Sequence, residues 1–179
     1  MPLVIAKSRP YPRFVEPGDE ALAVAVAHRL KLVRSDRWPL VAAHLLVAGH
    51  DGGAVVELAS LSRPVSGWEV DQLLPDVLAE LSAPELSDEE AGEVAARLLG
   101  QRLPDDGHPI IRTLAALAPG LDYPDGPIGR SYYLDEWLDC DCHRDSQERL
   151  DATSYEAALR ALPPLHVTDA LAEALVGRE

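Results

Sequence analysis

Apolar residues recur at helical spacing along most of the chain, and the clearest instance runs from residue 38 to residue 81. Its first part is apolar at almost every position and is bounded by Pro39 in the first turn and Gly49 after the last, which are typical boundary residues of a helix. Because nearly every face is apolar, we predict a helix over residues 38–48 that is buried on most sides and forms the centre of the core.

Two more helices are predicted directly after this one. Residues 54–61 follow a tight turn, and a longer helix begins after Ser66, whose spacing to Glu69 matches a capping box. Pro75 lies inside the longer helix and is expected to bend it, because its ring clashes with a carbonyl oxygen one turn back. The apolar positions of this helix form one stripe: Val70, Leu73, Leu74, Val77, Leu78 and Leu81.

The N-terminal residues 1–16 are predicted to form an extended arm. They contain the short apolar run Leu3–Ala6 and then prolines at positions 10 and 12, which exclude helix there. A helix is expected over residues 19–33. Its opening at residues 21–26 alternates as a strand would, but its length and its alanines favour helix.

The C-terminal half is predicted to contain helices that begin at capping residues. Ser87 with Glu90, and Thr153 with Glu156, match the capping box, in which a hydroxyl and a carboxylate each accept a backbone N–H hydrogen bond. Thr168 is predicted to begin a last helix. The intervening segments are a helix over residues 109–118, a long irregular loop over residues 119–130 and a short helix from Ser131.

Together these elements predict an all-α fold in which residues 1–179 form a single domain, a bundle or array of about eight to nine short helices. A domain of this size buries roughly 70% of the surface of its unfolded chain. Aromatic residues make up only 5% of the sequence, so the core is expected to be aliphatic. No fixed-length repeat is visible, although antiparallel stacking of short helices would look similar.

Charge is unevenly distributed along the chain. Residues 1–50 contain 7 Lys or Arg against 4 Asp or Glu, whereas residues 51–179 contain 9 against 26, and the net charge is −14. Such a field repels nucleic acid and anionic membranes and accelerates encounter with a basic partner. The alternative is that the charge only keeps the protein in solution. A cytoplasmic location is expected, because there is neither a signal peptide nor an apolar run of about 18 residues.

The predicted helix after Ser131 combines aromatic and acidic side chains. This combination is expected where a basic partner docks on an aromatic anchor, and the alternative is a core aromatic beside solvated acids. The candidate partner-binding residues are Tyr133, Asp135, Glu136, Trp137, Asp139 and Asp141.

Two cysteines and a histidine are the strongest candidates for chemistry. Cys140, Cys142 and His143 offer the thiolate and imidazole ligands that suit zinc, the one cofactor that the sequence allows. Their spacing is short for a zinc knuckle, and the chain has no second cysteine pair. The alternative is two ordinary thiols in a polar loop. A fourth ligand would be His108, His166 or Asp141.

Other catalytic motifs are weaker. His44 lies inside the apolar helix, and His50 and Asp51 in the turn after it could form an acid–base pair with His44, but no nucleophile can be assigned to them. A neutral histidine bonded to the backbone is more usual in such a helix. Neither a Gly-Lys-Ser/Thr phosphate loop nor a Gly-x-Gly-x-x-Gly motif occurs, so nucleotide binding has no support.

These observations give three functional hypotheses. The first is a non-enzymatic acidic protein that binds a basic protein partner, as an inhibitor, an antitoxin or a toxin-immunity protein would. The second is a metal-dependent enzyme or metal-stabilised domain that uses Cys140, Cys142 and His143. The third is a helix-turn-helix regulator that reads DNA with the helix after Ser66. The third is the least favoured, because that helix carries four acidic residues and no Lys or Arg to contact phosphate.

Overall fold

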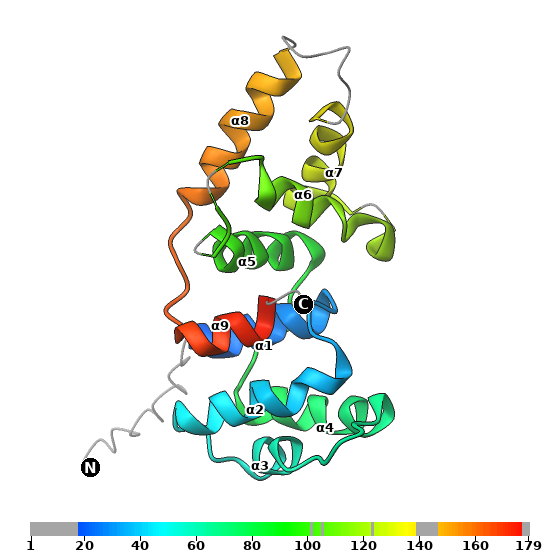
Figure 1. The fold of residues 1–179 in the computed structure, drawn as a ribbon, viewed down its shortest axis with the longest axis vertical. Coiled ribbons are helices and arrows are strands. Elements are labelled where there is room, and N and C mark those ends of the chain that lie inside the picture. The colour runs from blue at the N-terminus through cyan, green and yellow to red at the C-terminus, as the bar shows by residue number, and fades with distance from the viewer. Residues whose placement is uncertain (1–17, 101, 105, 123, 139–146, 177–179) are drawn as a thin grey trace, which may run out of the picture.

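A computed structural model describes residues 18–100, 102–104, 106–122, 124–138 and 147–176, and within these ranges the fold is all-helical and contains no strand (Figure 1). The predicted all-α class is therefore confirmed. The predicted arm over residues 1–16 lies outside the described residues, which begin at Gly18. The helices are α1 (Asp19–Arg29), α2 (Trp38–Val47), α3 (Gly53–Ala59), α4 (Gly67–Glu80), α5 (Asp88–Gly100), α6 (Pro109–Ala115), α7 (Gly126–Leu138), α8 (Gln147–Arg160) and α9 (Asp169–Val176), with 3₁₀ turns η1 (Ser35–Arg37) and η2 (Ala118–Leu121).

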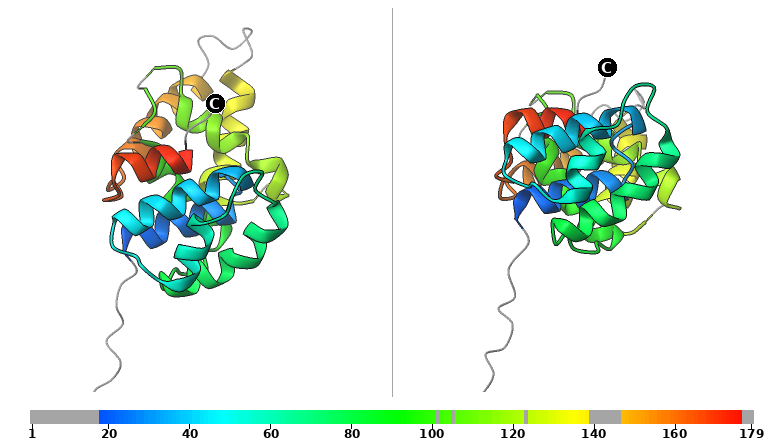
Figure 2. Two further views of the ribbon diagram at one scale, coloured as in Figure 1. Left: turned by 60° about the horizontal axis from the view of Figure 1, so that its bottom comes forward. Right: turned by 90° about the horizontal axis from the view of Figure 1, so that it is seen from below.

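The helices are arranged in levels along the long axis of the molecule. Helices α2, α3 and α4 lie at one end, α6, α7 and α8 at the other, and α1, α5 and α9 cross the middle (Figures 1 and 2). The last helix, α9, returns from the α8 end to pack against α1 and α2. The first and last described helices are thus neighbours in the middle of the fold.

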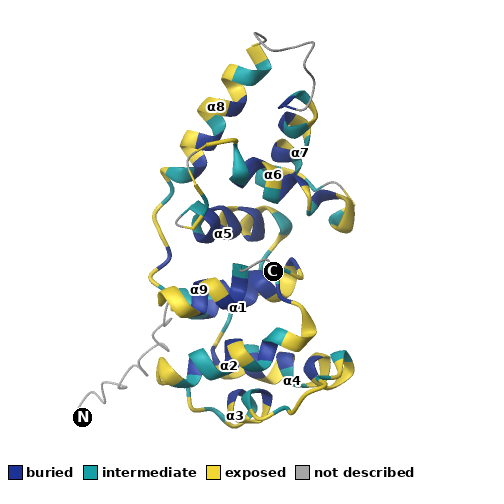
Figure 3. Ribbon diagram, in the orientation of Figure 1, coloured by how far each residue is buried: buried dark blue, intermediate teal, exposed yellow. Residues whose placement is uncertain are grey.

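The two most buried helices, α1 and α5, are rich in small side chains. In α1, five consecutive residues, Ala23–Ala27, are buried, and α5 is buried at Ala91, Ala95 and Ala96 as well as at its leucines. Alanine lets neighbouring backbones approach closely on several sides, so these two helices form the centre of the core (Figure 3). Apart from Trp38, the buried hydrophobic residues of the described core are aliphatic, as the scarcity of aromatic residues predicts.

The helix predicted over residues 38–48 is present as α2, but it is not buried on most sides. Trp38, Val41, Ala42 and Leu45 face the core, whereas Val47 on the other side is 86% exposed. Helix α2 packs against α3, α9 and η1, and the side that carries Leu40 and Val47 stays exposed. Apolar composition alone does not indicate how many neighbours a helix has.

The predicted long loop over residues 119–130 is much shorter in the structure. The 3₁₀ turn η2 covers its first residues, and α7 begins at Gly126 rather than at Ser131. Pro127 occupies the first turn of α7, where a proline fits because its missing N–H group would have no partner there. The glycines and prolines that indicated a loop thus belong largely to the turn η2 and to the first turn of α7.

The capping box predicted at Ser87 and Glu90 is confirmed. The Glu90 N–H donates to Ser87 Oγ at 3.3 Å, and Glu90 Oε2 accepts from the Ser87 hydroxyl at 2.7 Å and from the Ser87 N–H at 2.8 Å. These hydrogen bonds, the hydroxyl one foremost, lower the pKa of Glu90 below its usual 4.5. The stabilisation is therefore present above pH 4.5 and is lost as the pH falls through the lower pKa of the folded state.

Replacing Ser87 with alanine is expected to lower the melting temperature at neutral pH and to do so less in acid. The variant removes the hydroxyl that stabilises the charged form of Glu90, so the difference from the unsubstituted protein should shrink as Glu90 becomes protonated. Melting curves at about pH 7 and about pH 3.5 measure this. Ser62→Ala, in an exposed loop position, is the control and should show no such pH dependence. An equal difference at both pH values would contradict the prediction.

Two other predicted capping boxes are not formed. Ser66 does precede α4, but its side chain makes no capping hydrogen bond. Thr153 does not begin a helix: α8 starts at Gln147, so Thr153 lies inside it and its hydroxyl donates to the Arg149 carbonyl oxygen at 3.0 Å. Glu156 is buried, and its carboxylate is directed toward α6. The prediction failed because a Thr-x-x-Glu spacing also occurs in the middle of a helix.

Candidate functional site

The predicted aromatic and acidic surface lies on α7. Tyr133 is 54% exposed, and its ring meets that of Trp137 edge to face, with ring centroids 6.2 Å apart and an interplanar angle of 63°. Trp137 is half-buried and Glu136 is exposed. Asp135 is half-buried, and its Oδ1 lies 3.8 Å from Nη1 of Arg112 on α6. The structure thus gathers Tyr133, Glu136 and Trp137 on α7 and directs Asp135 toward α6.

The predicted metal ligands Cys140, Cys142 and His143 lie outside the described residues, as do Asp139 and Asp141. Within the described residues, no group of three or more His, Cys, Asp or Glu side chains could hold a metal ion. The two histidines considered as a fourth ligand are on different elements: His108 precedes α6, and the His166 N–H donates to Asp19 Oδ2 at 2.7 Å. The zinc site stays a prediction from sequence.

The turn that holds His50 and Asp51 borders a shallow cleft of about 310 Å³, and His44 is not among the residues that line it. Glu80 also lines this cleft and caps α3, since its carboxylate accepts the N–H of Ala54 at 2.9 Å and the N–H of Val55 at 3.2 Å. Glu80, the acid that lines this cleft beside His50 and Asp51, therefore has a structural role as the cap of α3.

Trp68, in the first turn of α4, is a surface residue that sequence reasoning missed. It is 70% exposed, whereas Trp38 is buried at 4%. The buried side of α4 is formed by Val70, Leu74 and Val77, and Trp68 falls on the opposite side at helical spacing. The sequence shows that Trp68 lies off the apolar stripe of α4, but only the structure shows that no other element covers it.

The outward side of α4 carries acidic side chains beside Trp68. Glu69, Asp71 and Asp76 are exposed, and no Lys or Arg occurs between Arg63 and Arg97. This is unfavourable for contact with DNA phosphates, so the helix-turn-helix hypothesis gains no support from the position of α4.

A buried ion pair on α8 holds the connection between α5 and α6. Glu156 is 5% exposed, and its carboxylate accepts the Ile110 N–H at 3.2 Å and the Ile111 N–H at 3.0 Å, which caps the start of α6. Arg160 Nη2 donates to Glu156 Oε1 at 3.0 Å. Arg160 also donates to three backbone carbonyl oxygens at and after the end of α5, those of Gly100, Leu103 and Pro104.

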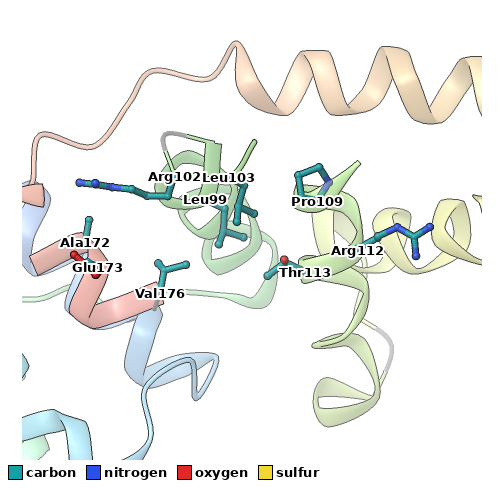
Figure 4. Close-up of a pocket in the computed structure, with 9 residues that line it drawn as sticks. All are labelled: Leu99, Arg102, Leu103, Pro109, Arg112, Thr113, Ala172, Glu173 and Val176. Atoms are coloured by element: carbon teal, nitrogen blue, oxygen red, sulfur yellow. The ribbon is translucent and has the colours of Figure 1, made fainter. Parts of the chain in front are cut away.

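The connection held by this ion pair forms one wall of a cleft of about 540 Å³ between α5, α6 and α9 (Figure 4). Its middle is apolar, and the side chains of Arg102 and Arg112 extend away from it in opposite directions. A volume of this size and a mostly apolar lining are typical of sites for small molecules. The lining residues are Leu99, Arg102, Leu103, Pro109, Arg112, Thr113, Ala172, Glu173 and Val176.

A second cleft lies beside the start of α7, where Arg130 and Tyr155 both line it. The guanidinium carbon of Arg130 lies 4.7 Å from the centroid of the Tyr155 ring, a cation–π contact between α7 and α8. Burial raises the pKa of Tyr155, and the positive charge of Arg130 opposes that shift. Tyr155 therefore stays protonated at neutral pH and acts as a packing surface.

Comparison with known proteins gives no relative: no family model, no curated protein and no solved structure matches this chain. Among the described residues, no helix has both the length and the apolar character needed to cross a membrane. Function must therefore be argued from the surfaces themselves.

Proposed function

We propose that this protein is a protein-binding module that receives a basic protein partner on helix surfaces where exposed aromatic residues lie among acids. The activity would be neutralisation of that partner, as for an inhibitor, an antitoxin or an immunity protein. The observation that carries the proposal is Trp68, which is 70% exposed on the outward side of α4.

A tryptophan that stays exposed contributes little apolar burial to folding, in a chain that has few aromatic residues to bury. Burying a large aromatic side chain removes roughly 150–250 Å² of surface from water, and the sequence contains only three tryptophans with which to do so. Tryptophan is also enriched among the residues that dominate binding energy at protein interfaces. A site for a partner gives Trp68 the burial that folding does not.

Charge indicates what kind of partner fits α4. The segment between Arg63 and Arg97 contains nine acidic residues and no Lys or Arg, and Glu69 and Asp71 are exposed within one helical turn of Trp68. Acidic side chains around an apolar anchor attract a basic surface and repel an acidic one. The attraction should accelerate association at low ionic strength, because salt screens exposed charges.

The same combination occurs on α7, where Tyr133 is exposed next to Trp137 and Glu136. These are three of the partner-binding residues predicted from sequence. We assign the first contact to α4 because Trp68 is more exposed than Tyr133, 70% against 54%. The surface on α7 is the second place at which the same partner is expected to dock.

Site-specific photocrosslinking tests the proposal. A benzophenone amino acid placed at Trp68 in cells that express the protein is expected to form an adduct with a basic protein, identified by mass spectrometry. The same amino acid at Val47, which is 86% exposed on α2, is the control. Trp68→Ala should then weaken binding of the purified partner by about thirtyfold or more, and Val47→Ala should leave it unchanged.

Salt dependence separates charge from apolar contact. The affinity for the captured partner is expected to fall between about 0.05 M and about 0.5 M salt, because exposed acids lose their attraction as the screening length shortens. An adduct that forms equally at Trp68 and Val47, an acidic partner, or an affinity that salt does not change would each contradict the proposal.

A further inference from the structure

We propose that the cleft between α5, α6 and α9 is a binding site for an uncharged, mostly apolar molecule that carries one hydrogen-bonding oxygen, such as a medium-chain alcohol. The proposal is independent of the protein-binding function, because no residue of α4 or α7 lines this cleft. Three features of the cleft support it: an apolar middle, arginines whose charges are already balanced, and the hydroxyl of Thr113.

The middle of the cleft fits an apolar chain. Leu99 and Ala172 are buried at 1%, and Leu103 and Val176 line the cleft with them (Figure 4). Placing apolar surface against these residues is favourable in proportion to the area removed from water. A ligand that is polar over its whole length would lose its water here and gain few hydrogen bonds. The middle of the cleft therefore selects a mainly apolar molecule.

The two arginines of the lining do not make the cleft a site for an anion. The side chains of Arg102 and Arg112 extend away from its middle (Figure 4). Arg102 Nη2 lies 2.7 Å from Asp169 Oδ1. Arg112 Nη1 lies 3.8 Å from Asp135 Oδ1, and Arg112 Nε donates to the Gly107 carbonyl oxygen at 3.3 Å. Because acids of the protein already balance both arginines, an anionic ligand would lose its hydration without gaining an opposite charge.

Glu173 is the remaining charged residue of the lining. It is exposed on α9, so its carboxylate stays hydrated. An exposed carboxylate attracts a cation only weakly, and it repels an anion. The charges around the cleft therefore favour a ligand that has none.

The hydroxyl of Thr113 on α6 supplies the polar contact. Its half-buried side chain is directed across the cleft toward Leu99 and Val176 (Figure 4). The other two threonines of the chain use their hydroxyls within the protein: that of Thr153 donates to a carbonyl oxygen of its own helix at 3.0 Å, and that of Thr168 accepts a backbone N–H at 3.3 Å. Thr113 makes no such hydrogen bond in the described part of the chain. Its hydroxyl can therefore donate to, or accept from, an oxygen of the ligand.

The cleft is held in shape before a ligand binds. The Glu156–Arg160 ion pair fixes the end of α5 and the start of α6, as described above. The Arg102–Asp169 contact fixes the start of α9 against the same connection. A site whose walls are already ordered loses less conformational entropy when a ligand binds.

Calorimetric titration with three probes of the same chain length tests the proposal: 1-octanol, octanoate and octyltrimethylammonium. 1-Octanol is expected to bind with a Kd below about 1 mM, and each ion is expected to bind about tenfold more weakly, because the lining balances neither charge. An ion that binds as tightly as 1-octanol, or no binding of 1-octanol at about 1 mM, would overturn the proposal.

Substitutions at Thr113 locate the ligand. Thr113→Val keeps the shape of the side chain and removes the hydroxyl, so it should weaken 1-octanol binding by about fivefold, the usual effect of one neutral hydrogen bond. Thr113→Ser retains the hydroxyl and should keep the affinity within about twofold. Thr153→Val makes the same change at an exposed position of α8 and should have no effect. Thr113→Trp should abolish binding by filling the cleft.

Circular dichroism verifies that each variant is folded. Unchanged affinity for 1-octanol in folded Thr113→Val, or binding that persists in folded Thr113→Trp, overturns the proposal. The comparison of Thr113→Val with Thr113→Ser decides the matter by itself if the tryptophan variant does not fold.

Discussion

Replacement of Glu156 by alanine is expected to lower the free energy of unfolding by about 3–5 kcal/mol, the usual effect of removing one partner of a buried ion pair. The carboxylate accepts two backbone N–H groups at the start of α6 and one guanidinium N–H of Arg160, so the variant leaves three donors without this acceptor. For a chain of this length the loss corresponds to a fall in melting temperature of about 10 °C, which thermal unfolding followed by circular dichroism measures.

Glu93→Ala on α5 is the matched control, because Glu93 is exposed and the change also replaces glutamate by alanine inside a helix. Its effect should stay within about 0.5 kcal/mol. Glu156→Gln keeps one acceptor oxygen and should give an intermediate loss. If Glu156→Ala and Glu93→Ala have equal stability, Glu156 does not cap α6 in solution.

Replacement of Gly129 by alanine is expected to destabilise the protein by about 2–3 kcal/mol, although alanine is the better helix former. A Cβ atom at Gly129 would lie 1.9 Å from the carbonyl oxygen of Pro124. That oxygen belongs to the backbone and cannot rotate away as a side chain can. The start of α7 and the segment before it would therefore have to separate, which denaturant unfolding measures.

Gly53→Ala provides the control for Gly129→Ala. Gly53 is also a helix residue, but a Cβ atom there would meet nothing closer than Glu80 Oε1 at 3.7 Å, an ordinary contact. This variant is expected to gain about 0.5–1 kcal/mol, because alanine restricts the unfolded chain more than glycine does. The two substitutions are therefore expected to have opposite signs. Equal effects would mean that the close approach of α7 to Pro124 is absent.

The helical class of this fold could be predicted from sequence because its helices carry local signals. The stripe through Val70, Leu74 and Val77 and the capping box at Ser87 each involve residues within about three turns of one another. Such signals do not depend on what packs against the helix. This is why the bounds of α4 and the start of α5 could be predicted closely.

Burial and long-range contacts could not be predicted in the same way. Glu156 has the spacing of a capping partner to Thr153, yet it caps a helix that lies more than 40 residues earlier in the chain. Which helices become neighbours depends on the whole topology, and no local pattern records it. The same applies to α2, whose apolar sequence does not reveal which of its sides stays exposed.

The candidate sites differ in the same way: a site formed by residues close in sequence could be predicted, and a site formed by several helices could not. Tyr133, Glu136 and Trp137 could be proposed together because they are close in sequence on one helix. The cleft could not, since its lining residues come from α5, α6, α9 and the connection between the first two. Trp68 lies between these cases: its position off the apolar stripe was visible, but its exposure required the structure.

The return of α9 to the middle of the fold affects how the chain can fold during its synthesis. Leu171 and Leu175 of α9 are buried, and α9 packs against α1 and α2, which leave the ribosome long before it. Until translation has passed α9, the apolar surfaces of α1 and α2 that it covers remain open to solvent and to other nascent chains. A ribosome that stalls before Asp169 would therefore release a product prone to aggregate, even though eight of the nine described helices had already been made.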